Sequence, residues 1–365
     1  MSDFSFVADN AGLADSIASV AQCPVVMLDT EFMRTDTFYP IPALLQLSDG
    51  TSHYLIDPLA ITDWAPLVAL FRNPNVIKVL HSVSEDLEVF QRLLGALPRP
   101  LLDTQVGAAL AGFGVGLGYQ RLLDTLLGIA IDKDETRSNW LQRPLSDAQC
   151  QYAVLDVLHL MPAFEVIRDA LEEQGRMSWW LEEGDRCIDR AEQQAPLEDY
   201  FRKIKSAWRL SPTDQLCLRA LCIWRETVAR EQDVPRGRIV KDAICIELAK
   251  RRPSHPGALS KIKGLTPSVI RRHGETLCDI LAVDYRDDGQ IPLEFPLNSA
   301  QKAKAKALRD AVDGLGDELA VPRELLMSKR DIEDSIRLER LAPGLDGWRS
   351  PVLTPILNEV LSVND

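Results

Sequence analysis

The 365-residue sequence lacks a cysteine framework and any segment typical of a leader or a membrane anchor. Its seven cysteines are an odd number without C-x-x-C spacing, so neither a set of disulfides nor a zinc site is expected. The first ten residues lack a basic start followed by an apolar stretch, and there is no run of about 18 apolar residues. We therefore expect a globular cytoplasmic protein.

Aromatic residues are also scarce. Phe, Trp and Tyr make up 6 % of the chain, and no segment interleaves them with arginine, so no platform for stacking single-stranded bases is predicted. The glycine-rich stretch 112–118 has no frame that gives G-x-G-x-x-G, so it predicts a loop and not a dinucleotide site.

The chain has fewer positive than negative side chains, with a net charge of −13, but its positive charge is concentrated in one segment. Residues 1–200 contain 13 Lys and Arg against 30 Asp and Glu, residues 201–286 contain 18 against 9, and residues 287–365 contain 10 against 15. This distribution suits an acidic body that holds metal ions and a basic module that binds a polyanion. A basic helical bundle without such a purpose has the same composition.

The N-terminal part contains a regular order of apolar runs. It begins with three consecutive strands that we expect to be antiparallel, followed by alternating helices and strands. The expected strands are residues 25–29, 44–48, 53–57 and 76–80, and the expected helices are 62–72 and a second one that ends at Gly95. The alternation continues past Leu101 and Leu102. This order predicts an α/β domain with a mixed sheet flanked by helices.

Two acids, Asp29 and Glu31, stand at the end of the first apolar run. Positions i and i+2 of a strand point to the same face, so the two carboxylates are expected side by side. Each raises the pKa of the other unless a cation neutralises them, and a hard divalent ion does this best. Strands also often end in an acid, so this pair alone does not identify a metal site.

Asp86 follows the strand at 76–80. Ser82 and Glu85 match the S-x-x-E capping box, so Asp86 is expected in the first turn of a helix. The helix dipole favours an acid there whatever its function. The functional cleft of an open α/β sheet lies beyond the carboxyl ends of its parallel strands, which is where this turn is expected.

A second capping signature, Ser146 to Gln149, begins a helix that is predicted to run to about Gly175. It carries Tyr152 and Asp156 at i and i+4, on one face. A tyrosine on a buried helix face usually belongs to the core, so this spacing alone is weak evidence for a site.

Three other polar residues receive no catalytic role. Asp103-Thr104-Gln105 lacks the second carboxylate of the Asp29 motif, so Asp103 is expected to end a strand or cap a helix. His81 and His159 are explained equally well by capping and packing.

Taken together, Asp29-x-Glu31, Asp86 and Tyr152-x-x-x-Asp156 resemble the motifs of the DEDD exonucleases, tyrosine subclass. The surrounding residues 28–32, 81–87 and 140–145 are similar to the bacterial ribonuclease D family, and the resemblance covers roughly residues 20–195. It implies a ribonuclease H-like fold, two divalent ions bound by the four acids, and a tyrosine that orients the attacking water.

Oxygen ligands favour Mg²⁺ or Mn²⁺ over zinc. Two such ions suit phosphodiester hydrolysis, because one generates the nucleophile while the other stabilises the leaving oxygen. On this resemblance Asp29 bridges the ions, Glu31 and Asp156 lie on the side of the water, and Asp86 lies on the other side.

An all-helical region with an internal repeat follows the linker at residues 193–197. Val234-Pro235-Arg236 recurs as Val321-Pro322-Arg323, each time between two expected helices. These helices are 218–230, 239–251, 303–311 and 327–340.

Residues 253–265 resemble the HRDC domain, a small nucleic-acid-binding module. Residues 346–349 are a degenerate counterpart, and the negative charge of the second copy also argues against nucleic-acid binding there. The candidate phosphate-contacting residues of the first copy are Lys250, Arg251, Arg252, Lys261, Lys263, Arg271 and Arg272.

We therefore predict a 3′–5′ exoribonuclease that releases nucleoside 5′-monophosphates. The exonuclease domain is expected over residues 1–195, and HRDC-type domains over 208–286 and 297–365. The expected substrate is RNA with a free 3′ end, such as a tRNA precursor. We expect a monomer with no obligate protein partner and no membrane association.

Two alternatives stay open at this point. The RNA preference rests on the resemblance alone, so a DNA exonuclease of the same subclass is one, and matched RNA and DNA strands distinguish the two. The other is a catalytically silent RNA-binding protein on this scaffold, against which the presence of all four acids and the tyrosine argues.

Overall fold

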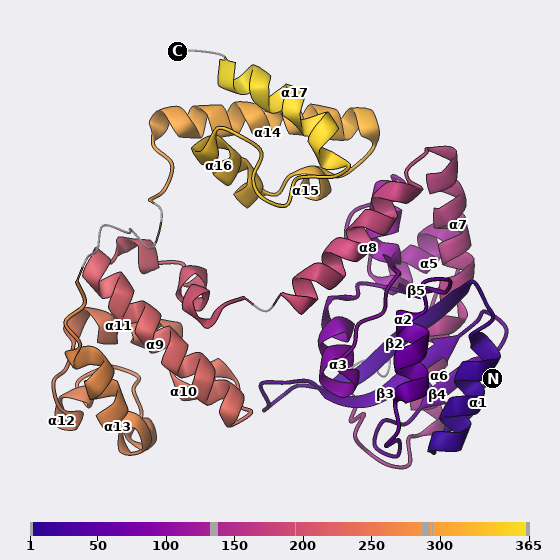
Figure 1. Cartoon of the computed structure of the whole chain (residues 1–365), viewed down its shortest axis with the longest axis horizontal. Coiled ribbons are helices and arrows are strands. Elements are labelled where there is room, and N and C mark those ends of the chain that lie inside the picture. The colour runs from indigo at the N-terminus through magenta and orange to yellow at the C-terminus, as the bar shows by residue number, and fades with distance from the viewer. Residues whose placement is uncertain (1–2, 132–137, 194, 287–292, 294, 363–365) are drawn as a thin grey trace. The chain divides into compact units, whose positions relative to one another are not determined.

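The chain folds into two compact units. Figure 1 shows the computed structural model, which describes residues 3–131, 138–193, 195–286, 293 and 295–362. The first unit contains Met1–Met33, Ile41–Glu192 and Leu297–Asp365, and the second contains Arg34–Pro40 and Gln193–Pro296.

A six-stranded mixed sheet forms the centre of the first unit, in the order β1-β4-β3-β2-β5-β6. The strands are β1 (Ser5–Val7), β2 (Val25–Met33), β3 (Ile41–Ser48), β4 (His53–Ile56), β5 (Ile77–Leu80) and β6 (Leu101–Asp103). The three predicted consecutive strands are β2, β3 and β4, and their antiparallel pairing is confirmed. The remaining pairs are parallel. We did not predict β1, because three residues are too few to show an alternating pattern.

Helices cover both faces of this sheet. Val26 and Leu28 of β2 pack with α1, α2 and α3, whereas Met27 packs with α4, α5 and α7 on the opposite face, as the alternation of a strand requires. The helices are α1 (Asn10–Val20), α2 (Ala65–Arg72), α3 (Ser84–Leu94), α4 (Thr104–Leu110), α5 (Tyr119–Leu127), α6 (Asp147–Leu158) and α7 (Leu160–Glu173).

The helix ends confirm some sequence predictions and correct others. Gly95 ends α3 in the left-handed conformation, and the capping box of Ser146 and Gln149 begins α6, both as predicted. The capping box predicted at Ser82 is wrong, because the N-cap of α3 is Val83 and Ser82 itself has φ of 60°. The helix predicted to run to about residue 175 is two helices, which break at His159.

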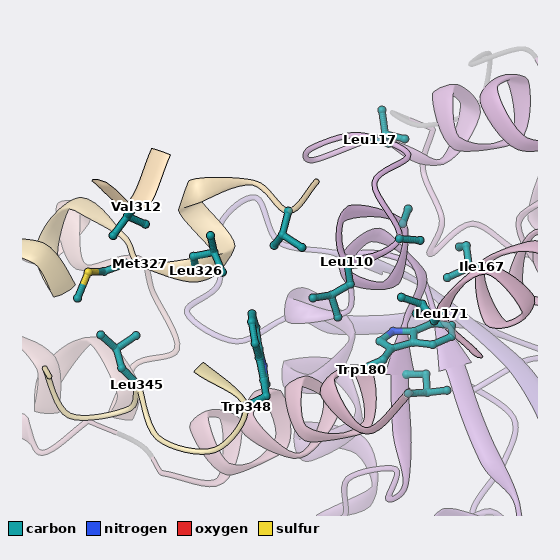
Figure 2. Packing of buried hydrophobic residues seen from close by; sticks show 14 of the residues in the cluster. Leu110, Leu117, Ile167, Leu171, Trp180, Val312, Leu326, Met327, Leu345 and Trp348 are labelled. Carbon is teal, nitrogen blue, oxygen red and sulfur yellow. The ribbon is translucent and has the colours of Figure 1, made fainter. Parts of the chain in front are cut away.

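The last four helices of the chain pack against the α/β part of the first unit. They are α14 (Ser299–Leu319), α15 (Arg323–Leu326), α16 (Lys329–Leu338) and α17 (Arg349–Ser362). Figure 2 shows the shared apolar cluster, in which Trp348 lies among side chains from both parts. The Trp348 ring stacks on Trp179 of α8 (Met177–Glu192), with ring centroids 4.4 Å apart.

A buried ion pair lies within this packing. The side chain of Glu183 accepts hydrogen bonds from both terminal nitrogens of Arg349, one of them at 2.9 Å, and from the Trp348 indole at 2.8 Å. Glu183 is 4 % exposed and Arg349 7 %. Each charge is therefore compensated by the other and by directed hydrogen bonds.

The second unit is helical and has its own apolar core. It comprises η1 (Leu197–Lys203), η2 (Ala207–Arg209), α9 (Pro212–Glu231), α10 (Arg236–Ile239), α11 (Asp242–Arg251), α12 (Pro256–Leu259) and α13 (Pro267–Ala282). The segment Arg34–Pro40 belongs to this unit: Phe38 is part of its core, and the amides of Phe38 and Tyr39 both donate to Asp233 at 3.0 Å.

The internal repeat appears as a repeated order of helices. Each copy contains a long helix, a four-residue helix that begins at the arginine of Val-Pro-Arg, a ten-residue helix and a final helix. These are α9, α10, α11 and α13 in the first copy and α14, α15, α16 and α17 in the second. Only α12 has no counterpart among the described residues, since residues 341–348 form turns at that place. The two halves therefore share one order of helices.

One helical stretch, Asp147–Glu173, is long and apolar enough to cross a membrane by length and composition alone. It is not an uninterrupted apolar run, because Asp156 and His159 lie within it. In the most apolar window 44 % of the residues are buried inside the protein, and the core helix of a soluble protein meets the same criterion.

The ion pair of Glu183 and Arg349 gives a test of the first unit. We expect Arg349→Ala to lower its free energy of unfolding by about 3–5 kcal/mol, because the substitution leaves a buried carboxylate without its cation. Thermal and denaturant unfolding measure the change. Arg330→Ala, at a position whose side chain is 86 % exposed, is the matched control and should change the free energy by at most about 0.5 kcal/mol. Equal effects of the two substitutions would contradict this account of the packing.

Candidate active site

β2 carries Asp29 and Glu31 at the centre of the sheet. Their cross-strand partners on β3 are Gln46 and Leu44, respectively. Met27, which has the same orientation, packs on the face covered by α4, α5 and α7. The alternation of the strand therefore places both carboxylates on that face, as predicted from their i and i+2 spacing.

Asp86 lies in the first turn of α3, directly after β5. It is 7 % exposed, and its carboxylate accepts a hydrogen bond of 2.5 Å from the Thr30 hydroxyl, which comes from β2 between the other two acids. Asp86 thus reaches the same edge of the sheet from a neighbouring element.

Asp103 holds the turn that precedes Asp86. Its carboxylate accepts from the amides of Ser82 at 2.9 Å and Val83 at 3.1 Å, and it also caps α4 through Gln105. The prediction that Asp103 ends a strand or caps a helix is confirmed, since it ends β6 and caps α4. Its bonds to the Ser82 turn also replace the capping box that we had predicted within the turn itself.

α6 supplies Tyr152 and Asp156 from one face of the helix. Together with Asp29 and Glu31 they line a cavity of about 190 Å³. The remaining side chains of its wall are those of Leu28, His81, Tyr119 and Leu160. The structure therefore brings four of the five predicted catalytic residues into one cavity, and Asp86 interacts electrostatically with two of them.

Burial raises the pKa of every acid in this group. The pKa of Asp29 is raised well above its usual value by burial and by the charge of Asp156. Burial, Asp29, Asp156 and Asp86 raise the pKa of Glu31 to about 10. Burial and the charge of Asp29 also raise the pKa of Asp86, and burial raises that of Asp156 to about 7. The carboxylates repel one another, so they can lie this close together only if protons or cations are shared among them.

The site is not a closed metal cage. Among the described residues, no three His, Cys, Asp or Glu side chains are grouped as a complete metal site. Mg²⁺ seldom uses such a cage, because it keeps several waters and binds through one or two carboxylates and the phosphates of its substrate. An open row of oxygen ligands fits that manner of binding.

Gln46 supports the same interpretation. It is fully buried opposite Asp29, and neither its amide nitrogen nor its amide oxygen has a hydrogen-bond partner within the described structure. Buried polar groups without partners are costly and usually pair with ordered water or an ion shell. We did not identify Gln46 from the sequence, although a single amide within the apolar strand Leu44–Leu47 was a usable signal.

Tyr119 and Thr30 were also missed. Tyr119 follows the glycine-rich stretch 112–118, which is a loop as predicted. Thr30 lies between the two acids of β2 and bonds the third. Nothing in the local sequence marks either residue, because both act on partners far away in the chain.

The basic residues predicted to contact phosphate lie on the second unit, in and between α11 and α13. Arg251 pairs with Glu247, and Arg252 pairs with Asp214. The other five are exposed, namely Lys250, Lys261, Lys263, Arg271 and Arg272.

Comparison with known proteins gives matches to both parts of the chain. A family model for 3′–5′ exonucleases matches residues 4–174, and a model for the HRDC domain matches residues 214–281. Ribonuclease D of Pseudomonas paraeruginosa is 37 % identical over 95 % of this chain and 94 % of that protein. Ribonuclease D of Escherichia coli is 34 % identical over 98 % of each.

Solved structures agree with these matches. The crystal structure of Escherichia coli RNase D, described as an exoribonuclease involved in structured RNA processing, has a TM-score of 0.93, with 34 % identity over 99 % of both chains. The catalytic core of RRP6 from Trypanosoma brucei, 18 % identical with a TM-score of 0.60 over 76 % of this chain and 79 % of that one, shares the fold.

These findings confirm the fold expected of the exonuclease part, the HRDC domain after it and the expected reaction. DEDD exonucleases depend on divalent metal ions, in agreement with the acidic cavity. The chain belongs to the ribonuclease D family of 3′–5′ exoribonucleases.

Proposed function

We propose that Asp29, Glu31, Asp86 and Asp156 hold two divalent ions, Mg²⁺ or Mn²⁺, at which RNA is hydrolysed from its 3′ end to nucleoside 5′-monophosphates. The observation that carries this proposal is the convergence of the buried acids: Asp29, Glu31 and Asp156 line one cavity, and Asp86 is bonded to Thr30, which lies between the two acids of β2. The raised pKa values of these acids support it. Such a group is stable at neutral pH when cations replace the missing protons.

Each acid has a distinct part in the proposal. Asp29 would bridge the two ions, because it interacts with both Asp156 and Asp86. Glu31 and Asp156 would hold the ion on the side of the attacking water, and Asp86 would hold the ion on the side of the leaving 3′-oxygen. When bound, the ions supply charge stabilisation at the attacking and leaving oxygens. Tyr152 orients the water by hydrogen bonding and does not act as a strong base.

We further propose that the substrate is structured RNA with a free 3′ end, such as a tRNA precursor. The relative described as an exoribonuclease involved in structured RNA processing supports this, since it matches the whole chain. Lys250, Arg251, Arg252, Lys261, Lys263, Arg271 and Arg272 of the HRDC domain would contact phosphates. A cytoplasmic monomer without an obligate protein partner or membrane association completes the proposal.

Removing the bridging carboxylate tests the catalytic assignment. We expect Asp29→Asn to lower kcat by about 10²- to 10⁴-fold, because several kcal/mol of transition-state stabilisation depend on the ions. The rate of nucleoside monophosphate release from an RNA with a free 3′ end measures it. Asp124→Asn, on the exposed side of α5, is the control and should retain full activity. Unchanged activity of Asp29→Asn, or equal cleavage of an RNA with a blocked 3′ end, would refute the assignment.

The raised pKa values predict how pH changes stability. Because the metal-free folded state holds protons more tightly than the unfolded state, its stability should fall as pH rises from about 4, the pKa of an unfolded carboxyl, through about 7 for Asp156 and towards about 10 for Glu31. Added Mg²⁺ requires deprotonated ligands. The rise in Tm that Mg²⁺ causes should therefore be larger at about pH 8 than at about pH 6.

Thermal unfolding with and without Mg²⁺ at both pH values measures this effect. Glu31→Gln is the control, since it removes a titrating ligand and should reduce the pH dependence. A rise in Tm that is equal at the two pH values would contradict the proposed link between the acids and the ions.

The basic surface of the HRDC domain predicts a salt-dependent contribution to binding. We expect the double variant Lys261→Ala and Lys263→Ala to raise KM for structured RNA and to reduce the slope of log affinity against log salt by about 1 to 2, because up to two phosphate contacts are lost. Binding assays over a series of salt concentrations measure the slope. Lys302→Ala with Lys306→Ala on α14 removes the same charge and should leave the slope unchanged. Equal losses from both pairs would show a general charge effect instead.

A further inference from the structure

Tyr119 lies at the break between α6 and α7. Its hydroxyl donates a hydrogen bond of 2.9 Å to the carbonyl of Leu155, the residue before Asp156. α6 ends at Leu158, so this carbonyl is among the last four of the helix, which have no partner within the helix. Tyr119 thus satisfies one of these four groups from outside.

The Tyr119 hydroxyl belongs to the environment of the acidic cavity. Burial and the charges of Asp156 and Asp29 raise the pKa of Tyr119 well above its usual value. The hydroxyl therefore keeps its proton at neutral pH and can donate to the Leu155 carbonyl.

Pro162 explains why the helix breaks where the apolar pattern continues. It lies in the first turn of α7, it has no amide hydrogen to donate to the Leu158 carbonyl four residues earlier, and in a continuous helix its ring would clash with that carbonyl. Tyr119 is the side chain that bonds α6 at this open end. The break lies within one turn of Asp156.

The ring of Tyr119 is held in place by its neighbours. It contacts the His81 ring with centroids 5.6 Å apart, and the His81 ring bonds the Thr104 hydroxyl at 3.0 Å. The loop before Tyr119 is tied to α4, because the Gln105 side chain donates to the Leu117 carbonyl at 3.0 Å. The hydroxyl is therefore presented by a supported scaffold.

Asp156 needs such support. It lies in the last turn of α6, where the negative end of the helix dipole disfavours a carboxylate and where no basic residue is present. A frayed or extended turn would carry this carboxylate away from Asp29.

We infer that Tyr119 is a positioning residue of the active site, which anchors the end of α6 so that Asp156 faces the metal site. This inference rests on the proposed function, since it gives Tyr119 its role through a proposed ligand. Tyr119 also lines the cavity with Tyr152, but it acts on the backbone of α6 and not on the substrate.

The test is Tyr119→Phe in the full chain, which removes the hydroxyl and keeps the ring. Without the hydroxyl, the end of α6 loses its bond to Tyr119, and Asp156 is no longer held in place. We expect kcat to fall about 10- to 100-fold with KM for RNA unchanged, because small misplacements of a catalytic group are costly. We also expect the concentration of Mn²⁺ at half saturation to rise several-fold, both in activity and in direct Mn²⁺ binding measured by electron paramagnetic resonance.

Tyr285→Phe is the matched control. The Tyr285 hydroxyl also donates to a backbone carbonyl, that of Ile280, at 2.9 Å, but in the second unit. The two variants lose the same kind of hydrogen bond and should show similar small decreases in Tm. Only Tyr119→Phe should change kcat and Mn²⁺ binding.

Asp29→Asn distinguishes a failure of the proposed function from a failure of the positioning role of Tyr119. If Asp29→Asn keeps its activity, the proposed function itself fails. If Asp29→Asn is inactive while Tyr119→Phe matches Tyr285→Phe in kcat and in Mn²⁺ binding, the positioning role of Tyr119 is overturned and the proposed function stands.

Discussion

The burial of like-charged carboxylates at one edge of the sheet is the constraint on which the rest of this site depends. Three different elements supply the four acids, which are Asp29, Glu31, Asp86 and Asp156. The negative charges of neighbouring acids in this group raise the pKa values of Asp29, Glu31 and Asp86. Repulsion of this kind separates the groups unless the backbone holds them. The elements that carry them are accordingly fixed by bonds from outside: Thr30 bonds Asp86, Asp103 fixes the turn before α3, and Tyr119 bonds the end of α6.

Much of this arrangement was predictable because it follows from local periodicity. The i and i+2 spacing of Asp29 and Glu31 needs only a strand, and the i and i+4 spacing of Tyr152 and Asp156 needs only a helix. Asp86 could be placed because a turn after a parallel strand lies at the functional edge of a sheet. Each prediction uses neighbours within a few residues.

Most of the features that were missed depend on distant partners. The turn at Ser82 is held by Asp103 from the next strand, so the local S-x-x-E pattern gave a wrong cap. The break between α6 and α7 is an exception, because Pro162 marks it locally. The bond that anchors the end of α6, in contrast, joins Tyr119 to Leu155, 36 residues later. Gln46 becomes relevant only through its register opposite Asp29. Bonds between a side chain and a remote backbone leave no periodic trace in a sequence.

The two helical modules show how one arrangement of helices serves different partners. In the second module the segment Asp346–Arg349 faces α8: Arg349 pairs with Glu183, Arg186 pairs with Asp346, and Trp348 stacks on Trp179. Since Arg349 already binds a buried carboxylate, this segment offers no cation to a phosphate. Its counterpart in the first module keeps Lys261 and Lys263 exposed. The unequal charge of the two copies therefore follows from what each contacts, with protein for the second and solvent for the first.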